Sequence, residues 1–356
     1  MTAEQGDAMS TEFWNGRSVL VTGATGLLGG CLVKELLSRG AEVTALVRDG
    51  APRSLFHREQ LYGRVNVVNG SLELDVMRRT IAEYSVKTVI HLAAQTLVGI
   101  AKVDPVGTFE ANIRGTWSVL EAARTTNMCQ VIVASSDKAY GDSLVLPYVE
   151  THPMDGRYPY DVSKSCIDLI TRTYHATYKL PVGVLRCGNL FGGGDLNFSR
   201  TIPGVILATL KGEPFRIRSD GTYVRDFLYV EDAADAYLLV AQSIASNPDL
   251  AGEAFNFSLG VRPTVLEVAR MVLKLMGAAD VDPIIENTAK GEIREQYTDS
   301  RKARQLLAWR PRYGLEEGLR RTIDWYRAYF ELNMQTPSAA AARKGKPEPV
   351  AAGTHR

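Results

Sequence analysis

Short runs rich in valine, isoleucine and leucine alternate with longer amphipathic segments over the first half of this chain. Such runs are typical of strands buried on both faces of a parallel sheet. The intervening segments place apolar residues three or four positions apart, as helices packed on a sheet do. We therefore predict strands at 18–22, 42–47, 65–68, 88–92, 130–134 and 182–186, and helices at 27–38, 108–124 and 161–178.

This alternation of strands and helices indicates an α/β fold, a doubly wound parallel sheet of the Rossmann type. Beyond residue 193 the alternation weakens: turn signals stand at 219–221 and 260, and helical periodicity returns at 265–276 and 315–332. We predict a first domain over 14–192, to which later segments can return, and a smaller mixed α/β lobe over 193–333. Residues 1–13 and 334–356 lack apolar periodicity, and we expect them to be disordered.

Composition excludes several classes of protein. The chain has 356 residues, 45% of them hydrophobic, and its longest apolar runs are too short to span a membrane. The polar N-terminus lacks the apolar segment of a signal peptide, so we expect a cytoplasmic protein. Forty-one basic residues against forty acidic ones give no excess for nucleic acid. The four cysteines have no close-paired spacing, which argues against a metal site and against a disulfide framework.

A glycine-rich turn follows the first predicted strand. Three glycines with the spacing GxxGxxG, together with Thr25, open the first helix at Leu27 and Leu28; they are Gly23, Gly26 and Gly29. Glycine lets the backbone approach a pyrophosphate, whose charge is favoured at a helix N-terminus. Such a turn can also serve helix packing alone, but its place between a first strand and an amphipathic helix predicts a dinucleotide site.

The identity of the dinucleotide depends on the end of the second predicted strand. An acidic residue there hydrogen-bonds the adenine ribose of NAD, and a basic one pairs with the 2′-phosphate of NADP. Arg48 and Asp49 are adjacent at this point, and Arg48 can equally be a solvated loop residue. We expect NAD, because the chemistry argued below recycles the nicotinamide. Arg48 leaves NADP open.

Several motifs together resemble one enzyme family. The sequence is similar to extended short-chain dehydrogenases/reductases of the nucleotide-sugar epimerase and dehydratase type over about residues 17–330. The motifs are the turn at 22–29, the segment 91–95, Asn112 within 111–116, Tyr160 with Lys164, and the segment 225–227. The resemblance implies that Leu92, Ala93 and Ala94 contact the cofactor. It also implies that His91 is a strand-end residue, and that Asn112 supports the sheet and a water near Lys164.

Within that family the sequence is most similar to CDP-glucose 4,6-dehydratases. The segments that carry this similarity are 94–98, 104–109, 136–138 and 186–195. Two segments depart from it. Residues 223–232 look like the general family, and Ser71 stands where an acidic residue often contacts adenine.

Tyr160 and Lys164 are four residues apart, so on a helix they share one face. An ammonium beside a phenol lowers the pKa of the phenol, and Tyr160 is then expected to take a proton from a sugar hydroxyl while hydride leaves for the nicotinamide. Ser136 is expected to hydrogen-bond the same hydroxyl. A YxxxK match alone more often marks a surface helix. The glycine turn and the strand that ends in Ser135-Ser136 favour catalysis here.

Asp137 and Lys138 follow Ser136 at the end of the fifth predicted strand. Oxidation at sugar carbon 4 acidifies the proton on carbon 5, and a dehydratase then needs a base for that proton and an acid for the carbon 6 hydroxyl. The resemblance assigns Lys138 as base and Asp137 as acid. These roles require a lowered pKa for Lys138 and a raised pKa for Asp137. The alternative is a solvated ion pair on a loop.

The substrate diphosphate needs cationic and amide donors from the second lobe. By resemblance we choose Gln95, Asn189 and Arg225, with Arg200 and Arg294 as further candidates. Arg225 and Asp226 can alternatively form a structural ion pair.

The residues thus predict an NAD-dependent nucleotide-sugar 4,6-dehydratase, acting on CDP-glucose or a similar hexose. It would form a 4-keto-6-deoxy sugar without net redox change. A 4-epimerase, a 5-inverting dehydratase and an idle NAD-binding regulator are the alternatives. We expect a homodimer or a larger homo-oligomer.

Overall fold

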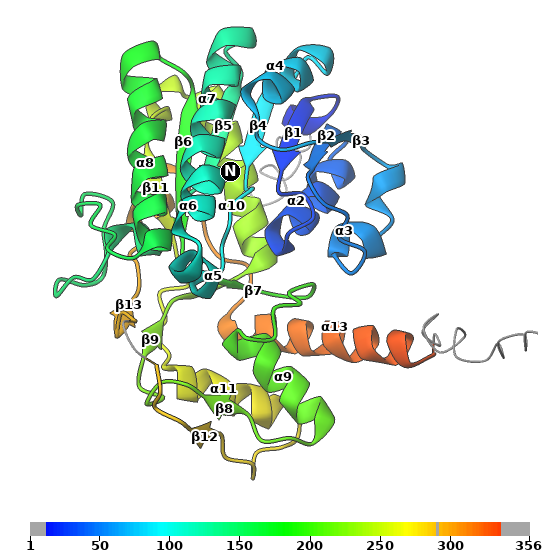
Figure 1. The fold of residues 1–356 in the computed structure, drawn as a ribbon, viewed down its shortest axis with the longest axis vertical. Helices are drawn as coiled ribbons and strands as arrows, with labels where there is room; N and C mark the ends of the chain where they lie inside the picture. Colours follow the sequence, from blue (N-terminus) through cyan, green and yellow to red (C-terminus); the bar gives the residue numbers. More distant parts are fainter. Residues whose placement is uncertain (1–11, 290–291, 336–356) are drawn as a thin grey trace, which may run out of the picture.

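A parallel sheet with helices on both faces forms the upper part of the molecule in Figure 1. The computed structural model describes residues 12–289 and 292–335. Within these residues seven strands form the sheet, in the order β11-β6-β5-β4-β1-β2-β3. They are β1 (Ser18–Thr22), β2 (Glu42–Val47), β3 (Asn66–Asn69), β4 (Thr88–His91), β5 (Gln130–Ala134), β6 (Val182–Cys187) and β11 (Ala254–Phe257). This architecture confirms the predicted doubly wound parallel sheet.

The two faces of the sheet carry separate apolar cores because successive strand residues point to opposite sides. Val19 and Val21 of β1 belong to the core beneath α2 (Leu27–Ser38) and α10 (Val230–Ser246). Leu20 belongs to the core on the other face, with α4 (Leu74–Glu83), α7 (Gly115–Thr126) and α8 (Pro159–Tyr178). The order of strands reverses at β1, which pairs with both β2 and β4. In sheets of this topology, ligands bind outside the carboxyl ends of the strands at that point.

Short elements connect these strands and helices. They include α3 (Leu55–Arg58), η1 (Leu61–Gly63), α5 (Val98–Val103), α6 (Pro105–Phe109), η3 (Asp137–Tyr140) and η4 (Pro248–Leu250). The residues predicted as a helix over 108–124 are all helical, but the helix is not regular: α6 is followed directly by a π-helical turn, η2 (Glu110–Arg114), and then by α7. An amphipathic pattern shows helical periodicity but not a local change in the hydrogen-bond ladder.

The second lobe lies below the carboxyl ends of the strands in Figure 1 and consists of short paired strands and helices. Its strand pairs are β7 (Asn189–Phe191) with β10 (Phe227–Tyr229), β8 (Arg216–Ile217) with β12 (Ile284–Ile285), and β9 (Val224–Arg225) with β13 (Glu295–Gln296). Its helices α9 (Thr201–Lys211) and α11 (Val265–Leu275) pack on each other. The helices α12 (Arg301–Leu306) and α13 (Leu315–Gln335) follow.

The chain passes between the two parts more than once. After the first visit to the lobe, α10 packs on α2 and β11 pairs with β6, so the segment 230–257 lies with the sheet. Residue 192 therefore does not separate two contiguous domains. At the N-terminus, Trp14 is fully buried. The predicted disordered segments lie mostly outside the described residues, although α13 continues to Gln335, past the predicted end of the lobe at 333.

Among residues 12–289 and 292–335, no helix combines the length and the apolar character that crossing a membrane requires. All four cysteines are free thiols, and Cys31, Cys129 and Cys187 are buried.

Candidate active site

A cleft of about 1570 Å³ opens where the strands end and the second lobe begins. Its wall contains residues that directly follow β1, β2, β3, β4, β5 and β6, and residues of α8 and of the second lobe. Polar side chains on separate strands thus converge on one space, as the order of strands predicts. The cleft is large enough for a dinucleotide and a second ligand beside it.

The glycine turn lines this cleft at the N-terminus of α2. Gly23 has a φ of +73°, and a Cβ there would lie 2.7 Å from the Ala93 nitrogen. A Cβ at Gly29 would overlap the Gly23 carbonyl oxygen. Gly26 caps α2 without a side-chain hydrogen bond, and the first turn of the helix holds no acidic residue. The first-turn amides are therefore available to an anion, so the chain fits a pyrophosphate here.

Most of the other residues predicted to bind the cofactor line the cleft. The cleft wall includes Thr25, Leu27, Leu28, Arg48, Leu92, Ala93 and Ala94, and also Ser71. Arg48 is solvent-exposed and its Nε donates to the Asp49 carboxylate at 2.6 Å. Because Asp49 already offsets the charge of Arg48, this pair favours NAD over a 2′-phosphorylated cofactor.

Asn112 and His91 lie behind the cleft. Asn112 is buried in η2, where its Oδ1 accepts from the Gln95 nitrogen at 2.7 Å and its Nδ2 donates to the Ser163 hydroxyl at 2.9 Å. It thereby fastens the loop after β4 to α8. The two ring nitrogens of His91 hydrogen-bond the hydroxyls of Thr22 and Thr116, and burial lowers the pKa of His91 to about 3. His91 is therefore a neutral structural residue.

Tyr160 and Lys164 both line the cleft from the first turns of α8. The Lys164 Nζ donates to the Ala134 carbonyl at 2.7 Å and lies 5.9 Å from the centre of the Tyr160 ring. Burial lowers the pKa of Lys164 to about 8. Burial and the nearby Asp137 carboxylate raise the pKa of Tyr160 well above its usual range, although a hydrogen bond with Ser136 acts the other way.

The expected lowering of the Tyr160 pKa by Lys164 is therefore wrong. The physical reason is that burial dominates, while the ammonium of Lys164 is engaged with a backbone carbonyl.

Asp137 and Lys138 form the first turn of η3, directly after β5. Asp137 is only 3% exposed; its Oδ1 accepts from the Ser136 hydroxyl at 2.9 Å, and its buried Oδ2 has no hydrogen-bond partner within residues 12–289 and 292–335. Burial raises the pKa of Asp137. Burial lowers the pKa of Lys138, and the Arg225 guanidinium adds to that effect, whereas the Asp137 carboxylate opposes it.

This is not a solvated ion pair on a loop. Both pKa shifts run in the directions that an acid at Asp137 and a base at Lys138 require.

Two further residues of this site were not predicted. Gln296 of β13 is fully buried and accepts a hydrogen bond from the Lys138 Nζ at 2.6 Å. Asp161 lines the cleft beside Tyr160, and burial raises its pKa to about 6. A signal existed for Asp161, because it lies inside the YxxxK motif. No signal existed for Gln296, which is separated from Lys138 by 158 positions.

The predicted substrate residues are only partly brought together. Asn189, Arg200 and Arg225 line the cleft. The side chain of Gln95 instead bonds Leu97 and Thr108, and the exposed Arg294 donates to Thr222. The structure places neither Gln95 nor Arg294 in the cleft wall.

The alternative of an Arg225–Asp226 ion pair is wrong. Arg225 pairs with Glu292 at 3.4 Å, whereas Asp226 is buried and accepts from Ser258 and from Thr298. Arg225 therefore keeps its guanidinium at the cleft wall.

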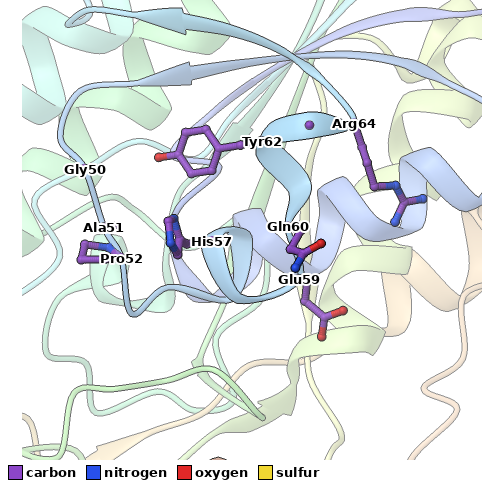
Figure 2. Close-up of a pocket in the computed structure, with 9 residues that line it drawn as sticks. Gly50, Ala51, Pro52, His57, Glu59, Gln60, Tyr62 and Arg64 are labelled. Atoms are coloured by element: carbon purple, nitrogen blue, oxygen red, sulfur yellow. The ribbon is translucent and has the colours of Figure 1, made fainter. Parts of the chain in front are cut away.

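A second pocket, of about 870 Å³, lies beside the cleft, between the segments 50–52 and 57–64 (Figure 2). It shares only Ala51 with the cleft. Its His57 and Tyr62 rings meet edge to face, with their centres 5.8 Å apart, and Glu59 pairs with Lys34. None of the residues predicted for catalysis lines this pocket.

Comparisons with known proteins agree with this geometry. Residues 19–257 match the NAD dependent epimerase/dehydratase family. CDP-glucose 4,6-dehydratase of Salmonella typhimurium is 31% identical over 337 residues, which cover 89% of this chain and 92% of the relative. UDP-glucose 4-epimerase of Mycolicibacterium smegmatis is 29% identical over 315 residues, which cover 86% of this chain and 98% of the relative.

Solved structures give the same result. A crystal structure of dTDP-glucose 4,6-dehydratase from Streptomyces venezuelae with NAD bound matches with a TM-score of 0.79 and 26% identity, over 88% of this chain and 98% of that one. NAD is the cofactor of the family, as the sequence analysis predicted. With its glycine turn, its strand order and a match over more than half of its length, the chain belongs to the NAD dependent epimerase/dehydratase family.

Proposed function

We propose that this protein is a nucleotide-sugar 4,6-dehydratase, acting on CDP-glucose or a similar nucleotide hexose. The observation that carries the proposal is the Asp137–Lys138 pair at the end of β5. Asp137 is buried and Lys138 is partly buried at the cleft wall, and the pKa of each is shifted toward the form that elimination needs. An epimerase oxidises and re-reduces carbon 4, so it has no use for such a pair.

The residues for oxidation lie together beside this pair. NAD, when bound along the glycine turn, would accept a hydride from carbon 4, return it at carbon 6, and supply a positive charge that favours the Tyr160 phenolate. Tyr160 would take the proton of the carbon 4 hydroxyl, and Ser136 would hydrogen-bond that oxygen. Lys164 holds its ammonium at the Ala134 carbonyl, where it adds positive potential to the same wall.

Elimination would follow at carbons 5 and 6. Lys138 removes the carbon 5 proton, which the carbon 4 ketone has made acidic. Asp137 donates a proton to the carbon 6 hydroxyl, which leaves as water. Lys138 then returns a proton to carbon 5 as carbon 6 receives the hydride. The proton that Tyr160 took from the carbon 4 hydroxyl replaces, through solvent, the one that Asp137 gave, so the sum of the steps is the loss of one water.

The substrate diphosphate would lie against the second lobe. Arg225 and Arg200 supply guanidinium groups and Asn189 supplies an amide, all in the wall of the cleft. Guanidinium groups suit phosphate oxygens because they donate in a planar fork. In the described part of the chain, Arg225 has one carboxylate partner, Glu292, which is itself partly solvent-exposed.

The deciding experiment offers the purified protein a panel of nucleotide sugars and measures product mass. A 4,6-dehydratase gives a product lighter by one water, without stoichiometric release of NADH. Stoichiometric NADH would indicate a dehydrogenase instead, and no conversion of any sugar would favour the NAD-binding regulator.

A 4-epimerase is the second candidate, since a UDP-glucose 4-epimerase is among the similar relatives and Ser136, Tyr160 and Lys164 would serve both reactions. The same panel separates the two. An epimerase gives an isomer of unchanged mass, and a 5-inverting dehydratase gives the mass loss with the opposite configuration at carbon 5.

We also propose that the protein acts in the cytoplasm as a homo-oligomer. Trp117 of α7 and Leu169 of α8 are 45% and 52% exposed on neighbouring helices, and apolar side chains of this size are typical of interfaces. Light scattering on the purified protein measures the mass directly, and a monomer at all concentrations would contradict this expectation.

A further inference from the structure

The environment of Lys138 contains a partner from the second lobe. The Lys138 Nζ donates to the Gln296 Oε1 at 2.6 Å. The Gln296 residue is fully buried, while its Nε2 has no hydrogen-bond partner among the described residues. A buried amide whose oxygen is hydrogen-bonded but whose nitrogen is not lowers the stability of the fold. Stability alone therefore poorly explains its presence here.

The backbone around Gln296 is held on both sides. The Arg294 carbonyl accepts from the Val224 nitrogen at 3.0 Å, and the Tyr297 carbonyl accepts from the Tyr148 nitrogen at 3.0 Å. The Thr298 nitrogen donates to the buried Asp226 carboxylate at 3.1 Å. The acceptor for Lys138 therefore stands on a fixed segment of chain. In the β9–β13 ladder, Gln296 is the direct neighbour of Arg225.

We propose that Gln296 is a positioning residue for Lys138: its side-chain carbonyl holds the Nζ in one place at the end of β5 while leaving it free to lose its charge. This inference rests on the proposed 4,6-dehydratase function, in which Lys138 is the carbon 5 base. Lysine has a long flexible stem, and a fixed acceptor reduces the positions that its amine visits. Because one N–H bond of the neutral Lys138 amine points at Gln296, the lone pair of that amine points away from Gln296.

The neutrality of the amide is the central point. A carboxylate in the place of Gln296 would hold Nζ equally well but would favour the ammonium, which cannot act as a base. Four charged groups already face Lys138: Asp137 and Asp161 from the sheet side, and Arg225 and Glu292 from the second lobe. An uncharged acceptor leaves this balance unchanged.

The ladder adds a connection to substrate binding. Because Gln296 and Arg225 are neighbours in one strand pair, a diphosphate that fixes Arg225 also fixes the strand that carries the acceptor for Lys138. The base would thus be aligned by the part of the substrate that does not react.

The test compares Gln296→Leu, which removes the acceptor, with Gln296→Glu, which keeps it and adds a charge. Gln130→Leu is the matched control, since Gln130 is also a buried glutamine with a hydrogen-bonded side chain but lies outside the cleft. Two rates are followed with substrate: reduction of bound NAD, and incorporation of solvent deuterium at carbon 5 across a range of pH.

We expect Gln296→Leu to lower deuterium incorporation by about 10- to 100-fold, while NAD reduction changes less than about threefold. Gln296→Glu should move the pH at which incorporation rises upward by about one unit or more, because the carboxylate favours the ammonium. Gln130→Leu should alter neither rate. Wild-type incorporation and pH dependence in both Gln296 variants would overturn the proposal.

A measurement on the free protein separates this inference from the proposed function. The Lys138 amine can be titrated by NMR with 15Nζ-labelled lysine and assigned by its loss in Lys138→Arg. A higher pKa in Gln296→Glu than in the wild type supports the contact, and an unchanged pKa overturns it. If the wild-type protein incorporates no solvent deuterium at carbon 5 of any nucleotide hexose, the proposed function is overturned, and with it the role of Gln296 in the reaction.

Discussion

Replacing Asp137 by asparagine should separate the two halves of the proposed reaction. The side chain is 3% exposed and its Oδ1 accepts from Ser136, which an asparagine carbonyl can also do. The substitution therefore nearly preserves the shape of the side chain, but an amide is too weak an acid to protonate the leaving hydroxyl. General acid catalysis is worth about 10²- to 10⁴-fold. At 1.36 kcal/mol per tenfold change, elimination should lose about 3–5 kcal/mol of transition-state stabilisation.

The same substitution should have an opposite effect on the base. The Asp137 carboxylate raises the pKa of Lys138, so its removal lowers that pKa further. A base with a lower pKa is neutral at lower pH, and deuterium incorporation at carbon 5 should therefore begin at lower pH in Asp137→Asn than in the wild type.

Rapid mixing with substrate provides the assay. Absorbance of the reduced nicotinamide should rise as in the wild type and then persist, while mass spectrometry shows little loss of water. Asp142→Asn, an exposed residue on the same segment, is the control and should behave as wild type. If Asp137→Asn forms the dehydrated product at the wild-type rate, the acid lies elsewhere and the reasoning from burial is refuted.

Four further outcomes are expected. Lys138→Ala should still reduce bound NAD but should nearly cease to exchange the carbon 5 proton, and normal deuterium incorporation would remove Lys138 from the mechanism. Tyr160→Phe should abolish both NAD reduction and product formation, which single-turnover absorbance checks. Gly29→Ala should cost about 1–3 kcal/mol in chemical unfolding and weaken NAD binding, because the new Cβ meets the Gly23 carbonyl; Gly50→Ala, with open space around it, should do neither. Burial raises the pKa of Asp226 to about 7, so the folded protein keeps a proton that the unfolded chain releases above its usual pKa of 3.8. The free energy of unfolding attributable to this group should therefore fall as pH rises from about 4 to 7, and Asp226→Asn should remove that slope from denaturant titrations.

The local parts of the site were predictable from the sequence. The turn at Gly23–Gly29 is recognised from spacing within one strand and one helix, and Tyr160 and Lys164 share a face because both stand on one helix. The predicted helix began at residue 161, whereas α8 begins at Pro159 and includes Tyr160 in its first turn. Such a difference of two residues is usual at helix ends.

The contacts between distant segments were not predictable in this way. Gln296 meets Lys138 through a two-residue strand, β13, whose pairing is set by the packing of the second lobe rather than by any sequence period. The direction of the Tyr160 pKa shift was also missed, because burial depends on how the elements pack around α8. The spacing of two charged residues in the sequence can show that they lie close together on a helix. How far a group is removed from water can be known only from the assembled fold.

The second lobe consists of two separate excursions from the sheet, and this has a consequence for how substrate preference can change. One excursion follows β6 and carries β8 and β9; the other follows β11 and carries β12 and β13. β8 pairs in parallel with β12, and β9 pairs in parallel with β13. A chimera that exchanges only one excursion with a relative would therefore leave half of each ladder without its matched register. Both excursions must be exchanged together. Recombination between homologous genes should therefore preserve specificity only when both excursions come from the same parent gene.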